Sequence, residues 1–383
     1  MKKKILIVTE RRADFSRFKP VIDKIKQEKL FTYQLIVTGV HLLKKYGYSI
    51  KEIKKGGYKV SETFSMYKKI ISSQDDGATM VSALGLAISK LSKIVKKKSP
   101  DIILSGFDIA ANFAVTIVGA HMNIPVVHIQ GGEVSGTIDE SIRHAMSKFA
   151  HYHLVSNLDA KNRLIKMGEV RKNIFVVGCP SIEALFNQKK IPAVYFQKKI
   201  GIDIHKKFII VIQHSVTSEF KNAASQIKET IKAINRLKIP ALFVCPNNDA
   251  GSTFIMNEIK KNNELFYTPT LTLREYKNLL EKCFVLVGNS SSGIHEASSF
   301  LKPVINIGSR QDGRLRSKNI IDVSYSAVKI FRCLKKLENR KYYASLIRNL
   351  HNPYEKPHTS DLILRALKSI KITGNAIQKK ITY

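Results

Sequence analysis

Tryptophan is absent from the 383-residue sequence, and cysteine is scarce. The cysteines lie far apart and form no CxxC pair, which argues against a zinc site and a disulfide framework; they are Cys179, Cys245, Cys283 and Cys333. No apolar run approaches the roughly 20 residues that cross a membrane. We therefore expect a cytoplasmic protein with reduced thiols, no metal site and no membrane span.

Acidic residues are also few. The sequence has 64 Lys and Arg against 30 Asp and Glu, a formal net charge of +34. The lysines fall in short separate groups, such as residues 96–98 and 260–261, without interleaved aromatics. This pattern predicts a solvated lysine-rich surface and no nucleic-acid partner. A field of this sign also favours capture of an anionic ligand such as a pyrophosphate.

The length exceeds what one hydrophobic core usually organises, which predicts two domains. Short β-branched runs alternate with longer amphipathic stretches, a pattern typical of parallel sheets covered by helices on both faces. Strands are predicted at residues 5–8, 33–37, 102–104, 126–129, 152–155, 174–177, 208–213, 241–245, 284–287 and 304–307.

The fold class is therefore α/β, with two Rossmann-like, doubly wound domains and a cleft between them. The predicted division is an N-terminal domain at residues 1–178, a C-terminal domain at 179–355, and a C-terminal helix and tail at 356–383. We expect the polar tail to fray from Thr373 onward. In such sheets ligands bind at the carboxyl ends of the strands, so the loops after the strands are where a site is expected.

In the second half, Gly288-Asn289-Ser290-Ser291 follows a buried strand and opens a helix. Backbone N–H groups, hydroxyls and the helix dipole there converge on an anion site. One turn on, Glu296 is placed to accept hydrogen bonds from a ribose, and Arg310 and Arg314 follow the next strand with guanidinium groups suited to phosphates. A capped helix and a solvated charged loop is the alternative interpretation.

In the first half, Arg12, Asp14 and Ser16 follow the first strand, where they either contact a phosphate or only cap the next helix. Asp108 follows the third strand, and Glu133 and Asp139 lie in a segment with three closely spaced glycines. These acids are either a catalytic group or a charge network at a helix end. His214, after a strand of the second half, is by itself more typical of a structural histidine.

Several of these motifs resemble the hydrolysing UDP-N-acetylglucosamine 2-epimerases, in order from about residue 5 to residue 325. The long strings Gly131-Gly132-Glu133-Val134-Ser135-Gly136-Thr137-Ile138-Asp139 and Ser141-Ile142-Arg143-His144 are specific to that group. Shorter matches are Arg12-Ala13-Asp14, Gln213-His214, Gly288-Asn289-Ser290-Ser291 and Gly308-Ser309-Arg310-Gln311. The resemblance implies the B-type glycosyltransferase fold, a nucleotide-sugar substrate, no metal or redox cofactor, and a homo-oligomer.

The resemblance also implies a mechanism. A base removes the C2 proton while the nucleoside diphosphate leaves C1, and water then adds to the resulting glycal with inversion at C2. The product is a free manno-configured sugar for nonulosonate or surface-glycan synthesis. Asp108 and Asp139 are the implied acid and base, with Glu133 as a third acidic candidate. The implied substrate-binding residues are Arg12, Asp14, Ser16, His214, Asn289, Ser290, Ser291, Glu296, Arg310 and Arg314.

The chain departs from the family in two places. The family reads His-Gly-Asp-Arg after the third strand, where this chain has Ser105-Gly106-Phe107-Asp108-Ile109, and His-Ile-Glu where it has His128-Ile129-Gln130. The amide of Gln130 cannot exchange a proton at neutral pH. Three hypotheses follow: a 2-epimerase that uses the remaining acids, a transferase acting on the same kind of donor, and a nucleotide-sugar-binding protein without turnover.

Overall fold

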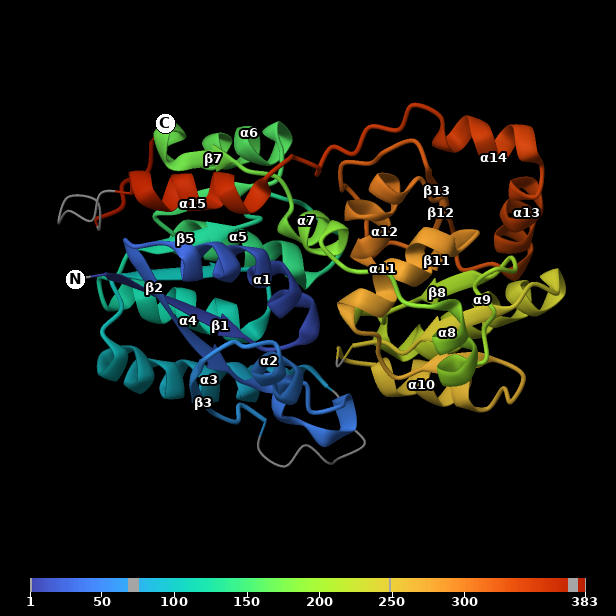
Figure 1. Cartoon of the computed structure of the whole chain (residues 1–383), viewed down its shortest axis with the longest axis horizontal. Helices are drawn as coiled ribbons and strands as arrows, with labels where there is room; N and C mark the ends of the chain where they lie inside the picture. The colour runs from blue at the N-terminus through green and yellow to red at the C-terminus, as the bar shows by residue number, and fades with distance from the viewer. Residues whose placement is uncertain (1, 68–75, 248, 371–377, 383) are drawn as a thin grey trace.

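The computed structural model describes residues 2–67, 76–247, 249–370 and 378–382. Two domains lie side by side, each built on one parallel sheet with helices on its faces (Figure 1). The first sheet has seven strands in the order β3-β2-β1-β4-β5-β6-β7, and the second has six in the order β10-β9-β8-β11-β12-β13. The predicted fold class is confirmed.

The N-terminal domain alternates strands with helices as far as β7. Its strands are β1 (Lys3–Thr9), β2 (Phe31–Val37), β3 (Val60–Thr63), β4 (Ile102–Gly106), β5 (Val126–Ile129), β6 (Tyr152–Val155) and β7 (Ile174–Val176). Its helices are α1 (Arg12–Gln27), α2 (Ile50–Lys55), α3 (Gly77–Lys98), α4 (Ala110–His121), α5 (Ile138–Phe149) and α6 (Leu158–Lys166), with short 3-10 turns η1 (Gly39–Leu42), η2 (Lys44–Tyr46) and η3 (Arg171–Asn173).

The chain then crosses to the second domain through α7 (Pro180–Phe186) and α8 (Ala193–Ile200). The strands there are β8 (Ile209–Ile212), β9 (Ala241–Val244), β10 (Phe266–Thr268), β11 (Val285–Gly288), β12 (Val304–Ile307) and β13 (Ile320–Val323). The helices are α9 (Ala223–Leu237), α10 (Ser252–Lys260), α11 (Leu273–Lys282), α12 (Ser291–His295), α13 (Ala327–Leu337) and α14 (Arg340–Ile347), with η4 (Thr217–Asn222) and η5 (Ala297–Phe300).

The central strands match their predicted positions because they are apolar and buried on both faces. Every residue of β4, β5, β8 and β12 is buried, as expected for strands of a parallel sheet covered by helices. The prediction missed β3, β10 and β13. All three lie at sheet edges and are partly exposed, so they lack a continuous apolar run.

Two expectations are corrected. The sequence pattern at residues 293–300 predicts one helix, but the structure has two pieces, α12 and η5, with Glu296 between them at φ −117° and ψ −40°. The end of the tail does not fray: the Lys379 ammonium donates to the carbonyl oxygens of Ser147 and Ala150, at 2.7 Å each. Residues 373–377 lie outside the described residues.

The C-terminal helix α15 (Thr359–Ser369) returns to the first domain, where Figure 1 shows it beside α1. Ile363 and Leu367 of α15 share a hydrophobic cluster with Phe18 and Val21 of α1. The chain therefore crosses between the domains twice, once near α7 and once before α15. These two crossings place α1 near the boundary between the domains.

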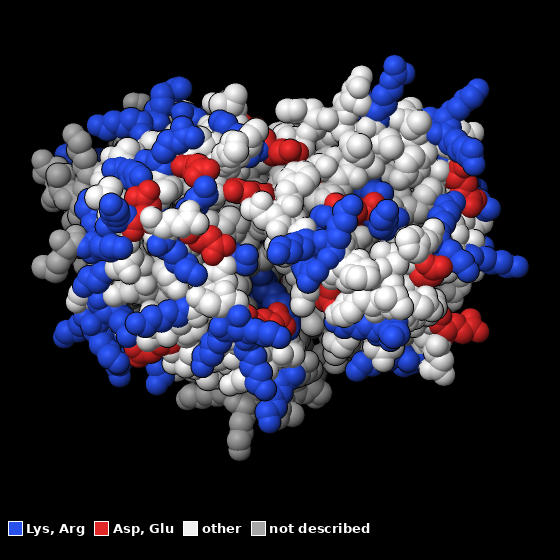
Figure 2. All heavy atoms as spheres, viewed as in Figure 1, with Lys and Arg blue, Asp and Glu red and all other residues white. Residues whose placement is uncertain are grey.

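One helix in the described part of the chain, α3, is long and apolar enough to cross a membrane by length and composition. It packs on one face of the first sheet, in a cluster that includes Ala87, Leu91 and Val95 together with residues of α4. Lys and Arg side chains are spread over both domains on the face drawn in Figure 2. This distribution agrees with the predicted lysine-rich surface.

Candidate active site

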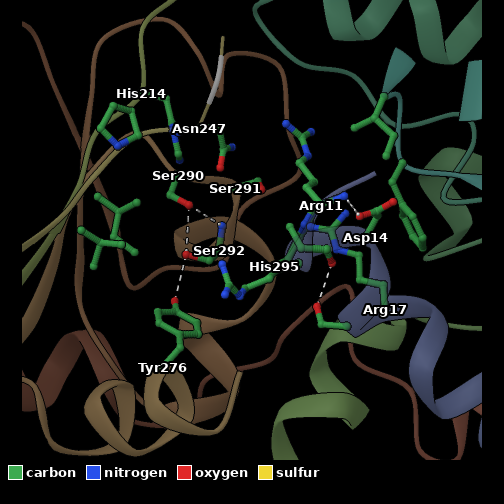
Figure 3. A pocket seen from close by; sticks show the side chains of 18 of the residues that line it. Arg11, Asp14, Arg17, His214, Asn247, Tyr276, Ser290, Ser291, Ser292 and His295 are labelled. Carbon is green, nitrogen blue, oxygen red and sulfur yellow. Dashed lines mark hydrogen bonds between the residues drawn. The ribbon is translucent and has the colours of Figure 1, made fainter. Parts of the chain in front are cut away.

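A pocket lies between the two domains, at the carboxyl ends of the strands of both sheets. In the first sheet the chain builds outward in one direction from β1 and in the other from β4, and in the second sheet it does so from β8 and β11. The loops after these four strands form part of the pocket wall. Ligands of doubly wound sheets bind at such switch points. Figure 3 shows Ser290, Ser291 and Ser292 on one side and Arg11, Asp14 and Arg17 on the other.

The structure brings together nearly all of the residues that the sequence singled out. Asn289 does not line the pocket. The predicted residues that do line it are Arg12, Asp14, Ser16, Asp108, Glu133, Asp139, His214, Ser290, Ser291, Glu296, Arg310 and Arg314. Their roles in binding and catalysis stay predictions.

The nucleotide side is built around the end of β11. Gly288 has φ 125°, and a Cβ atom there would collide with the carbonyl oxygen of Ile212, so only glycine fits this turn. Ser290 is the N-cap of α12, and its hydroxyl accepts a hydrogen bond from the N–H of Ser292 at 3.3 Å. The Tyr276 hydroxyl donates to the Ser292 hydroxyl at 2.9 Å. Hydroxyls and backbone N–H groups thus face the pocket here, and Arg310 reaches the same loop, with its Nη1 3.4 Å from the carbonyl oxygen of Asn289.

Asn289 holds the loops after β8 and β11 together. Its side-chain oxygen accepts from the N–H of His214 at 2.7 Å, and its amide donates to the His214 carbonyl oxygen at 2.9 Å. Burial and the nearby charge of Arg310 lower the pKa of His214 to about 3, so the ring is neutral at pH 7. Its Nδ1 accepts from the N–H of Asn247 at 3.3 Å, which leaves the Nε2 proton free to donate to an anion.

On the opposite side, Asp14 caps its own helix. Its carboxylate accepts from the N–H groups of Glu10 and Arg11, at 2.8 Å each. Ser16 does not cap the helix, because its hydroxyl donates to the carbonyl oxygen of Ala13. The Arg12 guanidinium forms a two-point ion pair with Glu52, with Nη2 at 2.6 Å and Nε at 3.1 Å from its carboxylate.

The two central acids have opposite pKa shifts. Burial opposes ionisation of Asp108, but the charges of Arg143 and Arg314 outweigh burial, and the pKa of Asp108 falls below its usual value. Arg143 is itself buried and paired with Asp108. Burial and the charge of Asp108 raise the pKa of Asp139. The pKa of one acid is therefore lowered and that of its neighbour is raised, although Arg310, 3.8 Å from Asp139, opposes the second shift. Two acids whose pKa values are pushed apart are the pattern of an acid–base pair.

The backbone on this side is strained at three residues. Phe107, Asp108 and Gln130 have φ of 70°, 43° and 60°, in the left-handed region that disfavours residues with a Cβ atom. All three directly follow β4 or β5 and line the pocket. They are also where the sequence departs from the resembled family. Such strain concentrates at functional sites because the surrounding structure must hold it in place.

Glu133 connects the two domains. Its Oε2 lies 3.0 Å from His295 Nε2 and 2.9 Å from Arg314 Nη1, both of the C-terminal domain. Its Oε1 accepts from Gln130 at 3.0 Å and from Ser156 at 2.7 Å. Although burial opposes ionisation, His295 and Arg314 hold the pKa of Glu133 well below its usual range. Glu133 is thus an ionised carboxylate, and each of its two oxygens already has two partners within the protein.

Glu296 lies on the wall of the pocket near the end of α12. Burial raises the pKa of its carboxyl group, an effect partly offset by the charge of Arg17 and by a hydrogen bond with Ser181. In the described part of the chain, no group of three His, Cys, Asp or Glu residues is placed to hold a metal ion.

Sequence reasoning missed several pocket residues, among them Arg11, Arg17, Arg143 and His295. Arg143 lies inside the motif Ser141-Ile142-Arg143-His144, so its position in that string was an available signal. Arg17 is one turn beyond Asp14 on α1, but nothing local to the sequence shows that this helix face meets the other domain. His295 is marked only by its contact with Glu133, which joins residues 162 positions apart, so no local sequence pattern could reveal it.

Two parallel-sheet domains with an arginine-rich, serine-lined pocket at their strand ends define an enzyme of the B-type glycosyltransferase fold. A family model described as UDP-N-acetylglucosamine 2-epimerase matches residues 23–368. The chain is similar to the hydrolysing UDP-N,N'-diacetylbacillosamine 2-epimerase of Legionella pneumophila, with 33% identity over 389 residues that cover 100% of each chain.

A second relative is the hydrolysing GDP/UDP-N,N'-diacetylbacillosamine 2-epimerase of Campylobacter jejuni, 32% identical over 97% of each chain. The fold matches the structure of S. aureus MnaA with UDP at a TM-score of 0.78, with 16% identity and 96% of each chain covered. The chain therefore belongs to the UDP-N-acetylglucosamine 2-epimerase family, and it is an enzyme of the hydrolysing 2-epimerase class. The resemblance inferred from the sequence motifs is confirmed.

Proposed function

We propose that this enzyme converts a UDP-linked N-acetylamino sugar into the free manno-configured sugar and UDP, by elimination followed by hydration. The observation that carries this proposal is the pair Asp108 and Asp139, whose pKa values shift in opposite directions. The reaction needs one group that accepts a proton and one that donates a proton at C2. Two carboxyl groups in one pocket whose pKa values are shifted in opposite directions are suited to these two roles.

The nucleotide binds against the C-terminal domain. Ser290 and Ser291 present hydroxyls and backbone N–H groups to the diphosphate, and His214 donates from Nε2. Arg310 adds a positive charge, and Glu296 accepts hydrogen bonds from the ribose. Arg12, Asp14, Ser16, Asn289 and Arg314 support this arrangement through the contacts described above.

In the elimination step, the ionised Asp108 accepts the proton from C2 of the sugar. The C2–H electron pair forms the C1–C2 double bond, and the C1–O bond breaks as UDP leaves with the electron pair of that C1–O bond. Arg143 keeps Asp108 oriented before the step. The product in the pocket is the glycal.

In the hydration step, Asp139 donates its proton to C2 from the opposite face, and water attacks C1. The water loses a proton to the Asp139 carboxylate, and Asp108 releases the proton that it took from C2 to solvent, so both acids return to their starting states. Glu133 stays ionised throughout and holds His295 and Arg314 in place beside the reacting groups. Gln130 takes no part in proton transfer, since its amide donates to Glu133.

The proposed sugar is an N-acetylamino sugar or its 2,4-diacetamido form, because the full-length relatives from L. pneumophila and C. jejuni are named for a diacetamido sugar. GDP remains the alternative nucleotide, since one of these relatives is named for both. The free sugar would enter nonulosonate, sialic-acid-like or surface-glycan synthesis in the cytoplasm.

The proposal includes self-association. The apolar helix α3 exposes Val81 at 68% and Met80 at 37%. Apolar surface of this kind marks interaction sites. Light scattering on the purified protein should give a mass of at least twice 43.2 kDa.

The test is to incubate the purified enzyme with UDP-N-acetylglucosamine and with its 2,4-diacetamido-6-deoxy analogue, without any acceptor. We expect UDP and a free 2-epimerised sugar in equal amounts. Product that forms only when an acceptor is added would show a transferase. Nucleotide binding without turnover of any UDP- or GDP-linked amino sugar would show a binding protein.

A further inference from the structure

The turn between β4 and α4, which carries Asp108, is strained at two consecutive residues. Phe107 has φ 70° and Asp108 has φ 43°, in the left-handed region that residues with a Cβ atom disfavour. Such a conformation persists only where neighbouring groups hold the chain in place. The groups that hold this turn therefore also fix the direction of the Asp108 carboxylate.

Asn112, in the first turn of α4, holds the turn from one side. Its side-chain oxygen accepts a hydrogen bond from the N–H of Gly106 at 3.1 Å, and its amide donates to the carbonyl oxygen of Val8 in β1 at 3.2 Å. Its own carbonyl oxygen accepts from the hydroxyls of Ser105 and Thr116, at 3.2 and 2.8 Å. Asn112 is fully buried, so water does not compete for these bonds. It ties the residue before the strained pair to the neighbouring strand.

Glu10, which follows β1, holds the turn from the other side. Its Oε2 accepts from the N–H of Ala111 at 3.0 Å, and its Oε1 accepts from the hydroxyl of Tyr67 at 2.7 Å. Helix α4 has no acidic residue in its first turn and no side-chain cap at Ile109. The Glu10 carboxylate therefore supplies the acceptor and the negative charge that a helix N-terminus favours. A Cβ atom at Gly39 would lie 2.1 Å from the Glu10 Cγ, so glycine leaves the space for this side chain.

We propose that Asn112 and Glu10 are positioning residues that aim the Asp108 carboxylate at C2 of the sugar. This inference rests on the proposed function, in which Asp108 accepts the C2 proton. Neither residue is among those that line the pocket. Arg143 pairs with the carboxylate itself, whereas Asn112 and Glu10 fix the backbone from which that carboxylate projects. The strained turn is thus held at both ends by buried hydrogen bonds.

The test uses Asn112→Ser, whose shorter side chain cannot span from Gly106 to Val8, and Glu10→Gln, which keeps the shape but has one acceptor oxygen instead of two. Because a small displacement of a catalytic group is costly, we expect kcat to fall about tenfold to a hundredfold in each variant. KM and the calorimetric affinity for UDP should change by less than about twofold, since the affected contact matters only in the chemical step. Asn112→Asp keeps the oxygen that faces Gly106 and should recover part of kcat.

Asn319→Ser is the matched control. Asn319 is also fully buried and donates to a backbone carbonyl oxygen, that of Lys302 at 2.7 Å, but it lies in the second domain and outside the pocket. The control should lower the melting temperature and leave kcat unchanged. Hydrogen exchange of the backbone amides of residues 106–112 reports on the turn without requiring turnover. Exchange there should be faster in Asn112→Ser and Glu10→Gln and unchanged in the control.

Wild-type kcat in both turn variants, or unchanged hydrogen exchange at residues 106–112, would overturn the inference. Equal losses of UDP affinity and turnover would also overturn it, because they would show a general loss of structure. If Asn112→Ser does not fold, Glu10→Gln carries the same test. Failure of the proposed function is distinct, since it would appear as absent turnover in a wild type that still binds UDP. Faster exchange in the variants would then still show that these residues hold the Asp108 turn.

Discussion

The two halves of the pocket, one from each domain, use different chemical groups. The C-terminal half uses Gly288 and the serine hydroxyls that follow it, together with the neutral His214 and the guanidinium groups of Arg310 and Arg314 from other loops. The N-terminal half uses buried charges and three residues with left-handed backbone, Phe107, Asp108 and Gln130. The first half is suited to hold an anion, and the second is suited to shift pKa values.

This difference follows from what each half must do. An anion is bound by donors that point in fixed directions, which a tight turn and a helix start provide at little cost. Proton transfer at neutral pH needs carboxyl groups with altered pKa values, which requires burial and neighbouring charges. The backbone strain found at the strand ends of the acid-bearing half is consistent with that second requirement.

The largest expected effect is on turnover, and it should come from the N-terminal half of the pocket, which carries Asp108 and Asp139. Asp139→Asn removes the proposed proton donor while keeping its shape, so turnover should fall by about 10² to 10⁴-fold. UDP affinity should change by less than about twofold. Rates of UDP release and calorimetric binding measure the two quantities. A loss of UDP binding as large as the loss of turnover would place Asp139 in nucleotide binding instead.

The wild-type pH profile sharpens the same point. A general acid must be protonated to act, and burial together with the charge of Asp108 raises the pKa of Asp139. The rate should therefore fall as pH rises through this raised value, and the fall should be absent from the residual rate of Asp139→Asn. An identical profile in the variant would contradict the assignment.

Glu133→Gln should act mainly on stability, since the carboxylate joins the two domains. Breaking a buried ion pair costs about 3–5 kcal/mol, measured as free energy of unfolding in urea. Glu338→Gln, which removes an exposed partner of Lys207 and Lys335, is the control and should cost less than about 1 kcal/mol. Equal effects of the two substitutions would contradict a special role for Glu133.

The stability lost in Glu133→Gln should depend on pH in a defined direction. Its folded pKa lies well below the ordinary 4.5, so its contribution is fully present above about pH 4.5. The contribution disappears as pH falls from there through the folded pKa. The difference in melting temperature between wild type and variant should be constant from pH 6 to 8 and shrink only in acid.

Gly288→Ala tests the turn of the nucleotide half. The new Cβ would meet the carbonyl oxygen of Ile212 at a φ of 125°, so we expect a loss of about 3 kcal/mol in stability and weaker UDP binding. Gly85→Ala in α3 has open space around it and should stabilise the helix by about 0.5–1 kcal/mol. Thermal unfolding with and without UDP measures both effects.

The smallest effect is expected for Ser290→Ala. Losing this N-cap should cost about 1 kcal/mol and reduce UDP affinity several-fold. Ser326→Ala removes the N-cap of α13, which lies outside the pocket. It should cost similar stability and leave UDP affinity unchanged. If both variants bound UDP like the wild type, Ser290 would serve the helix alone.

The same contrast explains what the sequence could predict. The strands of both sheet centres and the loop from Gly288 to Ser291 are contiguous patterns, and their geometry follows from local rules. Sequence patterns did not predict the edge strands β3, β10 and β13, because partly exposed strands lack a continuous apolar run. The ion pair of Glu133 with Arg314 joins residues 181 positions apart, so no local pattern could reveal it.

Individual residues show the same limit. Asn289 stands in the anion-binding motif, yet its side chain ties His214 to the turn instead of lining the pocket. Arg12 matches the family motif but is paired with Glu52. Arg17, which no motif marked, has no carboxylate within ion-pair distance among the described residues and lies over the ring of Phe107. Which arginine is free depends on where carboxylates from other loops lie, and only the folded chain determines that.

The central claim is that the pocket acids Asp108 and Asp139 remove and return a proton at C2. It is tested most directly by proton NMR of the reaction in heavy water, with UDP-N-acetylglucosamine and its 2,4-diacetamido-6-deoxy analogue. The account predicts free manno-configured sugar with deuterium at C2, together with UDP. A released sugar that keeps its original C2 proton and configuration would contradict it, because UDP would then leave by simple hydrolysis at C1.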